Sequence, residues 1–167
     1  MPYAMPPSDL MPVIDAPPTP MVSMGPGGQY LALVHHAAHP EVARLARPYL
    51  ALAGLRIDPR LRARRRLRRA GRLSVLRVAD GTERYLGLPD GAQVGAPVWA
   101  ADGRRFAFTV DQADGVGVWV ANAETAEAAE VPGLVVCDVL GGEPAAGARP
   151  VPRTGRSPDS AAILTAA

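Results

Sequence analysis

Three histidines lie close together in the chain, and histidine is a common metal ligand. His35, His36 and His39 form the pattern H-H-x-x-H, which resembles the H-E-x-x-H helix of zinc metalloproteases. The glutamate that acts as general base in that motif is replaced by His36, and Pro40 follows His39 directly, so a helix could hardly continue. We therefore expect loop histidines, and we predict no metal ligand and no cofactor.

A serine near the C-terminus is the second candidate for chemistry. Serine hydrolases place their nucleophile in a G-x-S-x-G turn between a strand and a helix. The nearest match is the segment around Ser157, G-R-S-P-D, which lacks the second glycine. Its proline and its place in a repeat described below favour an ordinary turn. We assign no catalytic residue.

The arginines form the third candidate. All 18 positive charges are arginine, which excludes a lysine-dependent phosphate loop and a Schiff-base lysine. Eight of them lie between Arg60 and Arg72, and such a cluster could bind phosphates or carboxylates. No aromatic residues are interleaved with them, and Leu61, Leu67 and Leu73 follow neither a helical nor a strand period. A solvated or domain-facing loop is favoured over a nucleic-acid or acidic-partner site.

The composition limits the elements that could position these residues. The chain has 167 residues, of which 48% are hydrophobic and 20% charged, as in a soluble globular domain. It contains 17 glycines and 18 prolines, which is typical of many short strands joined by turns. Its single cysteine, Cys137, excludes an internal disulfide. No apolar stretch approaches the ~20 residues that span a bilayer, and prolines interrupt any signal peptide, so we expect a soluble, cytoplasmic chain without a membrane partner.

Two kinds of strand–turn unit recur along the chain. A glycine turn precedes the apolar run Tyr30–Val34, an Asp-Gly turn within Trp99–Thr109 precedes another, and Ser157–Thr165 contains a third. The hairpin pattern of Leu73–Arg84 returns in Val118–Ala128, 45 residues later. Four-stranded propeller blades repeat at about 40–50 residues. These patterns predict an all-β fold, a partial β-propeller of about two to three blades.

The organisation that we expect has four parts. A proline-rich extended arm over residues 1–20 precedes the first strand unit, 21–34. An insertion over 35–72 contains a short helix that ends before Pro48, extended chain into a turn over Leu52–Pro59, and the arginine-rich loop. Propeller blades occupy 73–167, the last one incomplete, and their open edges would favour self-association.

The aromatic side chains on the predicted strands have two possible roles. Trp99, Phe106, Phe108 and Trp119 could form a ligand cage or an inter-blade core. The core is favoured, because large aromatic side chains on strands are usually buried between packed sheets.

Three stretches in order resemble the multidomain serine peptidases of the prolyl oligopeptidase class, nearest to its glutamyl-endopeptidase and acylaminoacyl-peptidase-like bacterial branch. Asp15–Pro20 resembles the N-terminal arm of that family, and Leu45–Pro48 with Leu52–Pro59 resembles its insert. Val98–Thr109 resembles its blade motif W-S-P-D-G-K-x-x-A-F-T. Residues Leu134–Arg156 fit less well.

The resemblance implies a β-propeller that caps an α/β-hydrolase domain and restricts its active site to peptides. The nucleophilic serine, the acid and the histidine of the family all lie in that hydrolase domain, so no residue here inherits a catalytic role. The expected partners are the hydrolase domain and the peptide substrates of the parent enzyme. The expected function is a non-catalytic propeller portion of a serine peptidase; the alternative is a free-standing interaction module whose arginine-rich loop binds an acidic partner.

Overall fold

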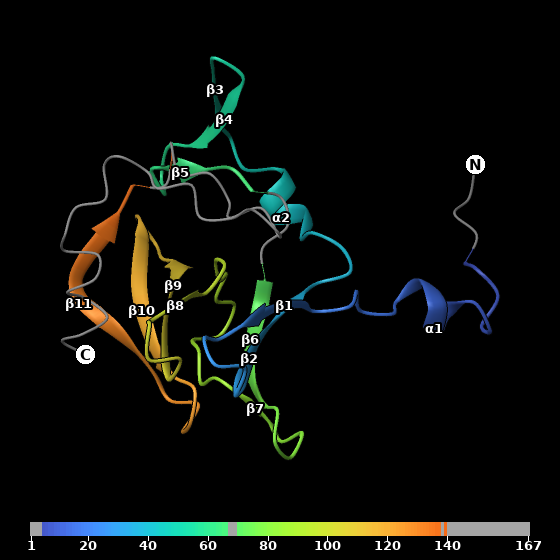
Figure 1. Cartoon of the computed structure of the whole chain (residues 1–167). Coiled ribbons are helices and arrows are strands. Elements are labelled where there is room, and N and C mark those ends of the chain that lie inside the picture. The colour runs from blue at the N-terminus through green and yellow to red at the C-terminus, as the bar shows by residue number, and fades with distance from the viewer. Residues whose placement is uncertain (1–4, 67–69, 138, 140–167) are drawn as a thin grey trace.

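The described part of the chain folds into three antiparallel sheets and two helices of one turn each (Figure 1). The computed structural model describes residues 5–66, 70–137 and 139. The elements are α1 (Met11–Ile14), β1 (Met21–Met24), β2 (Tyr30–His36), α2 (Val42–Leu45), β3 (Leu50–Leu52), β4 (Leu55–Asp58), β5 (Ala63–Arg64), β6 (Ala70–Arg77), β7 (Glu83–Tyr85), β8 (Val98–Trp99), β9 (Arg105–Asp111), β10 (Val116–Asn122) and β11 (Ala128–Val136). The described part of the chain is thus mostly β-sheet, as expected.

Two of the sheets have four strands each and face one another. The first has the order β1-β2-β6-β7, and the second has the order β11-β10-β9-β8, in which every strand pairs with its neighbour in sequence. Val94 lies between them and forms isolated bridges with Ala70 of the first sheet and Val110 of the second. The two sheets therefore share one core.

The turns before β2 and β9 have the same geometry. Gly28 and Gly103 are 75 residues apart and both have a positive φ, 68° and 65°, which glycine adopts at little cost. Each donates its N–H to the carbonyl three residues earlier, Gly25 and Ala100, at 3.0 and 3.1 Å. The glycine turn and the Asp-Gly turn noted in the sequence are therefore equivalent.

The turns after β6 and β10 also match, at the predicted offset of 45 residues. Gly81 and Ala126 have φ of 69° and 60°, and each donates its N–H to the carbonyl four residues earlier, Arg77 and Asn122, at 2.9 Å. The turns before β2 and β9 are 75 residues apart, and the turns after β6 and β10 are 45 residues apart. The difference of 30 residues is the extra chain between β2 and β6. The strand–turn repeat is confirmed for the described residues, whereas the third copy, around Ser157, lies outside them.

The core between the sheets contains a row of aromatic rings. Phe106 is fully buried, and its ring centroid lies 4.8 Å from Trp99 and 6.0 Å from Phe108, which lies 6.5 Å from Trp119. The Trp99 indole N–H also donates to the Ser23 hydroxyl of β1 at 3.1 Å, which joins the sheets near their short strands. The prediction that these four aromatics form core is confirmed.

The insertion between β2 and β6 forms the third, smaller sheet, β3-β4-β5, and helix α2. The predicted short helix is present as Val42–Leu45. Within Leu52–Pro59, expected as extended chain into a turn, β4 is extended and a turn follows it. The further turn at Ala53–Gly54, through which Leu50–Leu52 pairs with β4, is not predicted. The expected arginine-rich loop also contains regular structure, since β5 and the start of β6 fall within it.

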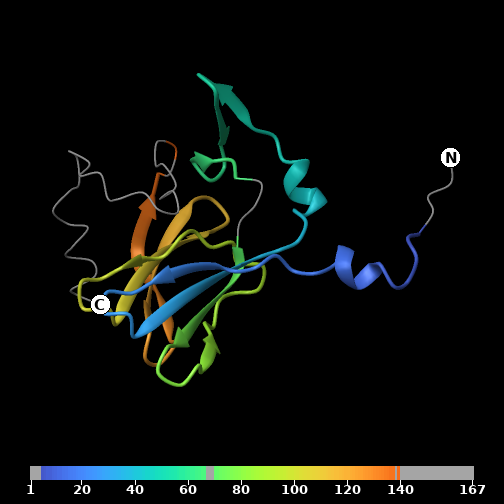
Figure 2. The same ribbon diagram turned by 45° about the vertical axis from the view of Figure 1, so that its right-hand side comes forward.

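The N-terminal arm projects away from the sheets (Figures 1 and 2). Its described residues contain one helical turn, α1, with proline in its first turn, a position where the missing N–H is harmless. Met5, Leu10 and Val13 are exposed. Neither helix of the described residues has the length and apolar character of a membrane span.

Candidate functional site

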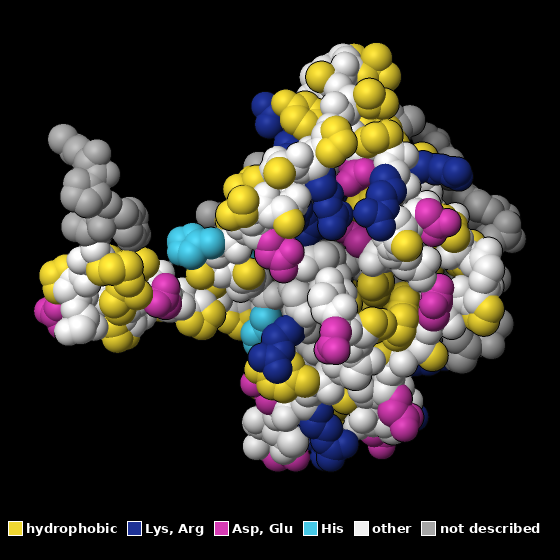
Figure 3. Space-filling view, turned by 180° about the vertical axis from the view of Figure 1, so that it is seen from behind, with side chains coloured by type: hydrophobic (Ala, Val, Ile, Leu, Met, Phe, Trp, Pro, Cys, Tyr) yellow, Lys and Arg dark blue, Asp and Glu magenta, His cyan; other side chains and the backbone are white. Residues whose placement is uncertain are grey.

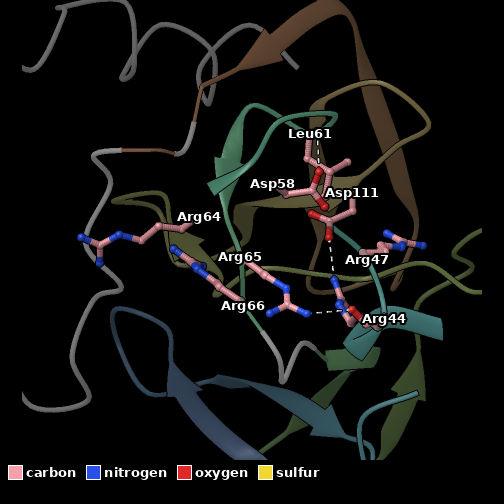
Figure 4. Close-up of a pocket in the computed structure, with 8 residues that line it drawn as sticks. All are labelled: Arg44, Arg47, Asp58, Leu61, Arg64, Arg65, Arg66 and Asp111. Atoms are coloured by element: carbon pink, nitrogen blue, oxygen red, sulfur yellow. Dashed lines mark hydrogen bonds and ion pairs between the residues drawn. The ribbon is translucent and has the colours of Figure 1, made fainter. Parts of the chain in front are cut away.

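The arginine-rich insertion meets the second sheet at a charged hollow (Figure 4). Its walls come from the region of α2, from β4 and the chain after it, and from the end of β9. The lining residues are Arg44, Arg47, Asp58, Leu61, Arg64, Arg65, Arg66 and Asp111. The hollow encloses about 10 Å³, the space of about one water molecule, so it is far too small for a peptide or nucleotide.

Arg44 forms the central contact of this site. Its guanidinium donates to the Asp111 carboxylate at 2.9 Å and to the Gln93 side-chain oxygen. The Arg44 and Asp111 side chains are 13% and 8% exposed. A nearly buried ion pair of this kind holds α2 against β9, and removing one partner is costly because the other charge stays desolvated.

The neighbouring arginines also bind within the molecule. Arg65 donates to the Leu45 carbonyl at 2.6 Å, and Arg60 donates to the Ala113 carbonyl. The Arg56 and Arg65 guanidinium groups lie 5.3 and 4.6 Å from the ring centroid of Tyr49, within the range of a cation–π contact. Several arginines of the predicted loop thus have structural roles.

Asp58 shapes the turn between β4 and β5. Its carboxylate accepts the backbone N–H groups of Arg60 and Leu61 at 3.0 and 3.3 Å. Leu61 and Ala63 are then buried against Val116 of β10. The insertion is therefore fixed to the second sheet by an apolar contact as well as by the Arg44 ion pair.

Two of the three histidines lie at the end of β2 and the third in the following loop. Their side chains are not gathered into a site. The described residues hold no group of three His, Cys, Asp or Glu side chains arranged to bind a metal.

His35 belongs instead to a serine–histidine–glutamate cluster that the sequence did not predict. The Ser74 hydroxyl lies 2.8 Å from His35 Nε2 and donates to Glu83 Oε1 at 2.6 Å. In a catalytic triad the serine proton points to the histidine, and the acid binds the other ring nitrogen. Here the serine proton goes to the glutamate, and Ser74 is fully buried. The cluster joins β2, β6 and β7 and contains no available nucleophile.

The aspartates of two hairpin turns have shifted pKa values. A hydrogen bond from the backbone N–H of Thr82 lowers the pKa of Asp80, and one from the backbone N–H of Arg104 lowers that of Asp102. Both carboxylates also pair with an arginine three residues away, Arg77 at 3.4 Å and Arg105 at 3.3 Å. These groups stabilise turns, and neither lines the hollow.

Comparison with known proteins relates the chain to peptidases. It is 32% identical over 139 residues to a protein of Oryza sativa subsp. japonica named "Probable glutamyl endopeptidase, chloroplastic", and 34% identical over 134 residues to a protein of Arabidopsis thaliana with the same name. These matches cover 77% and 74% of the chain, but only 15% and 14% of the plant proteins. The chain is thus a peptidase-related domain that spans about one seventh of these relatives.

The remaining comparisons add little. No family model matches the chain. A solved structure of a protein described as a dipeptidyl aminopeptidase IV from Bacteroides ovatus covers 65% of the chain, with 17% identity and a TM-score of 0.42, and the chain covers 16% of it. Because the plant relatives are named chloroplastic, the cytoplasmic location expected above stays a prediction.

Proposed function

We propose that the chain is a non-catalytic β-propeller portion of a glutamyl-endopeptidase-type serine peptidase of the prolyl oligopeptidase class. The observation that carries this proposal is the pair of face-to-face, four-stranded antiparallel sheets with equivalent turns, in a chain about one third identical to plant glutamyl endopeptidases. Each sheet corresponds to one blade. The role of the blades is to pack on the catalytic domain and limit which substrates reach it.

The outer face of the first sheet supports a propeller with further blades. The strand register places Val22, Leu33, Ser74 and Tyr85 in one row on the face opposite the core, with Met24 in the next row. Val22, Met24 and Tyr85 are exposed. This face carries exposed apolar side chains beside the polar cluster of Ser74, His35 and Glu83. A sheet with large apolar side chains on both faces is stabilised by a neighbour on each side, so another blade would cover this one.

The chemistry of the described residues supports a non-catalytic role. The buried Ser74 hydroxyl donates a hydrogen bond to the Glu83 carboxylate, and the arginine-lined hollow has room for about one water molecule. Peptide hydrolysis would be performed by an α/β-hydrolase domain elsewhere in the longer polypeptide.

A chimera tests the proposal. The segment of the rice protein that aligns with this chain is replaced by this chain, and the unaltered rice protein serves as reference. We expect the chimera to hydrolyse short glutamate-containing peptides and to leave a folded protein substrate intact. The isolated chain should not react with a fluorophosphonate probe for activated serines. An unfolded or inactive chimera, or a labelled isolated chain, would contradict the proposal.

The acidic-partner module is less well supported. Arg44, Arg60 and Arg65 use their guanidinium groups inside the molecule, which leaves fewer of them for a partner than the sequence suggests.

A further inference from the structure

The small sheet of the insertion is anchored at its base and exposed toward the tip of its hairpin. The register pairs Leu50 with Ile57 and Leu52 with Leu55, and because side chains alternate across a strand, these four lie on the same face. Leu50 and Leu52 are 58% and 64% exposed, and Leu55 and Ile57 are half-buried.

The base of the opposite face packs on the body of the molecule. Asp58 pairs with Ala63 in the register, and both are buried, with Ala63 in contact with Leu61 and Val116. Nearer the tip of the hairpin, Ala51 and Arg56 of this face are exposed. The sheet is therefore held at its base and presents the leucines of its outer strand to the surface.

The surroundings of the exposed leucines are strongly basic. Residues 40–66 contain eight arginines and two acidic residues, Glu41 and Asp58. Asp111 neutralises Arg44, whereas Arg60 and Arg65 donate to backbone carbonyls and so keep their positive charge. Figure 3 shows the hydrophobic side chains gathered over the hairpin at the top of the molecule, with arginine side chains below them. An apolar patch with a charged rim is the usual composition of a protein interface.

We propose that this leucine face, defined as Leu50, Leu52, Leu55 and Ile57, docks on an apolar surface with carboxylates at its rim on another domain of the same peptidase polypeptide. The inference rests on the proposed function. Four side chains make a small patch, which suffices between domains joined in one chain, where the effective concentration is high. The curated relatives are about seven times longer than the matched segment, so they hold ample chain for such a domain.

Two other occupants fit the observations less well. A second copy of the chain would bring a second set of arginines against the first, and like charges repel across an interface. A membrane would be entered by the tip of the hairpin, where only Leu52 and Leu55 flank the small residues Ala53 and Gly54. Membrane binding scales with the apolar area buried, and two leucines bury far less than the apolar face of an interfacial helix.

The test compares the isolated chain with the rice chimera described above. Amide hydrogen exchange over Leu50–Ile57 should be at least tenfold slower in the chimera than in the isolated chain. The double variant Leu50→Asp with Leu52→Asp should lower the melting temperature of the chimera and leave that of the isolated chain unchanged. Val78→Asp, at a half-exposed valine of the β6–β7 turn, is the matched control and should change neither.

The outcomes separate the two proposals. An active chimera in which Leu50–Ile57 exchanges as fast as in the isolated chain overturns the docking inference alone. An unfolded or inactive chimera contradicts the proposed function, and the inference falls with it. Leucine-dependent dimerisation of the isolated chain in sedimentation, or its leucine-dependent binding to phosphatidylglycerol vesicles, would overturn the inference in favour of a second copy or a lipid surface.

Discussion

Arg44 shows at the scale of one residue how the insertion is held in place. Its guanidinium reaches Asp111 and Gln93, residues 67 and 49 positions away in sequence. We expect Arg44→Met to lower the free energy of unfolding by about 2–3 kcal/mol, because it deletes a charge-assisted bond to a nearly buried carboxylate. Urea unfolding of the isolated chain measures the change. Arg47→Met, at an exposed arginine of the same segment, should change it by less than about 0.5 kcal/mol; equal effects would contradict the anchoring role of Arg44.

The lowered pKa of Asp102 makes a prediction about acid stability. Its carboxylate is stabilised in the folded state by the backbone N–H of Arg104, so the folded pKa lies below the unfolded value of 3.8. The contribution to stability is then present above pH 3.8 and is lost as the pH falls through the folded pKa. Asp102→Asn should flatten the fall of the free energy of unfolding below pH 3.8. Identical acid titrations for wild type and Asp102→Asn would exclude this role.

At the scale of the elements, the hairpin turns depend on the left-handed conformation of single residues. Gly81 has a φ of 69° with open space around it, and Gly71 has equal space but no positive φ. We expect Gly81→Ala to lower the free energy of unfolding by about 1–2 kcal/mol, whereas Gly71→Ala should leave it unchanged or raise it slightly. Chemical denaturation of the two variants tests this, and a Gly71 variant as unstable as the Gly81 variant would show that packing, not φ, decides.

The regular elements could be predicted from the sequence where the signal is local. Gly103 follows an aspartate in a recognisable turn, and Ala126 was located by the offset of 45 residues although alanine gives no turn signal. The β3–β4 hairpin was missed, although two short apolar runs flank Ala53–Gly54. The prediction of extended chain into a turn over Leu52–Pro59 contains β4 and the turn after it, but no turn at Ala53–Gly54.

The candidate site depends on contacts that no local pattern contains. His35 and Ser74 are 39 residues apart and meet only through the register of β2 with β6, which contains an irregularity between His35 and His36. The ion pair of Arg44 depends equally on where α2 lies against the second sheet. The arginine cluster was recognised from composition, but its internal partners follow from tertiary packing.

At the scale of the whole molecule, we expect the two four-stranded sheets to unfold in one cooperative transition, because they share a core. Phe106 is fully buried between them. Phe106→Ala should lower the free energy of unfolding by about 3–5 kcal/mol, a large part of the stability of a domain this size. Circular dichroism and tryptophan fluorescence should lose their transitions at the same lower temperature. Val98→Ala, at an exposed position of β8, is the control, and two separate transitions in the Phe106 variant would contradict the shared core.

The insertion also gives the two sheets different folding problems. In the second sheet β9 ends at Asp111 and its partner β10 begins at Val116, so this pair can close as a local hairpin within microseconds. In the first sheet β2 ends at His36 and β6 begins at Ala70, so pairing must wait for a long loop to close. Loop-closure entropy rises by only about 0.6 kcal/mol for each doubling of length, so the delay is kinetic more than thermodynamic. The half of the domain that leaves the ribosome first is therefore the half that completes its hydrogen bonding last.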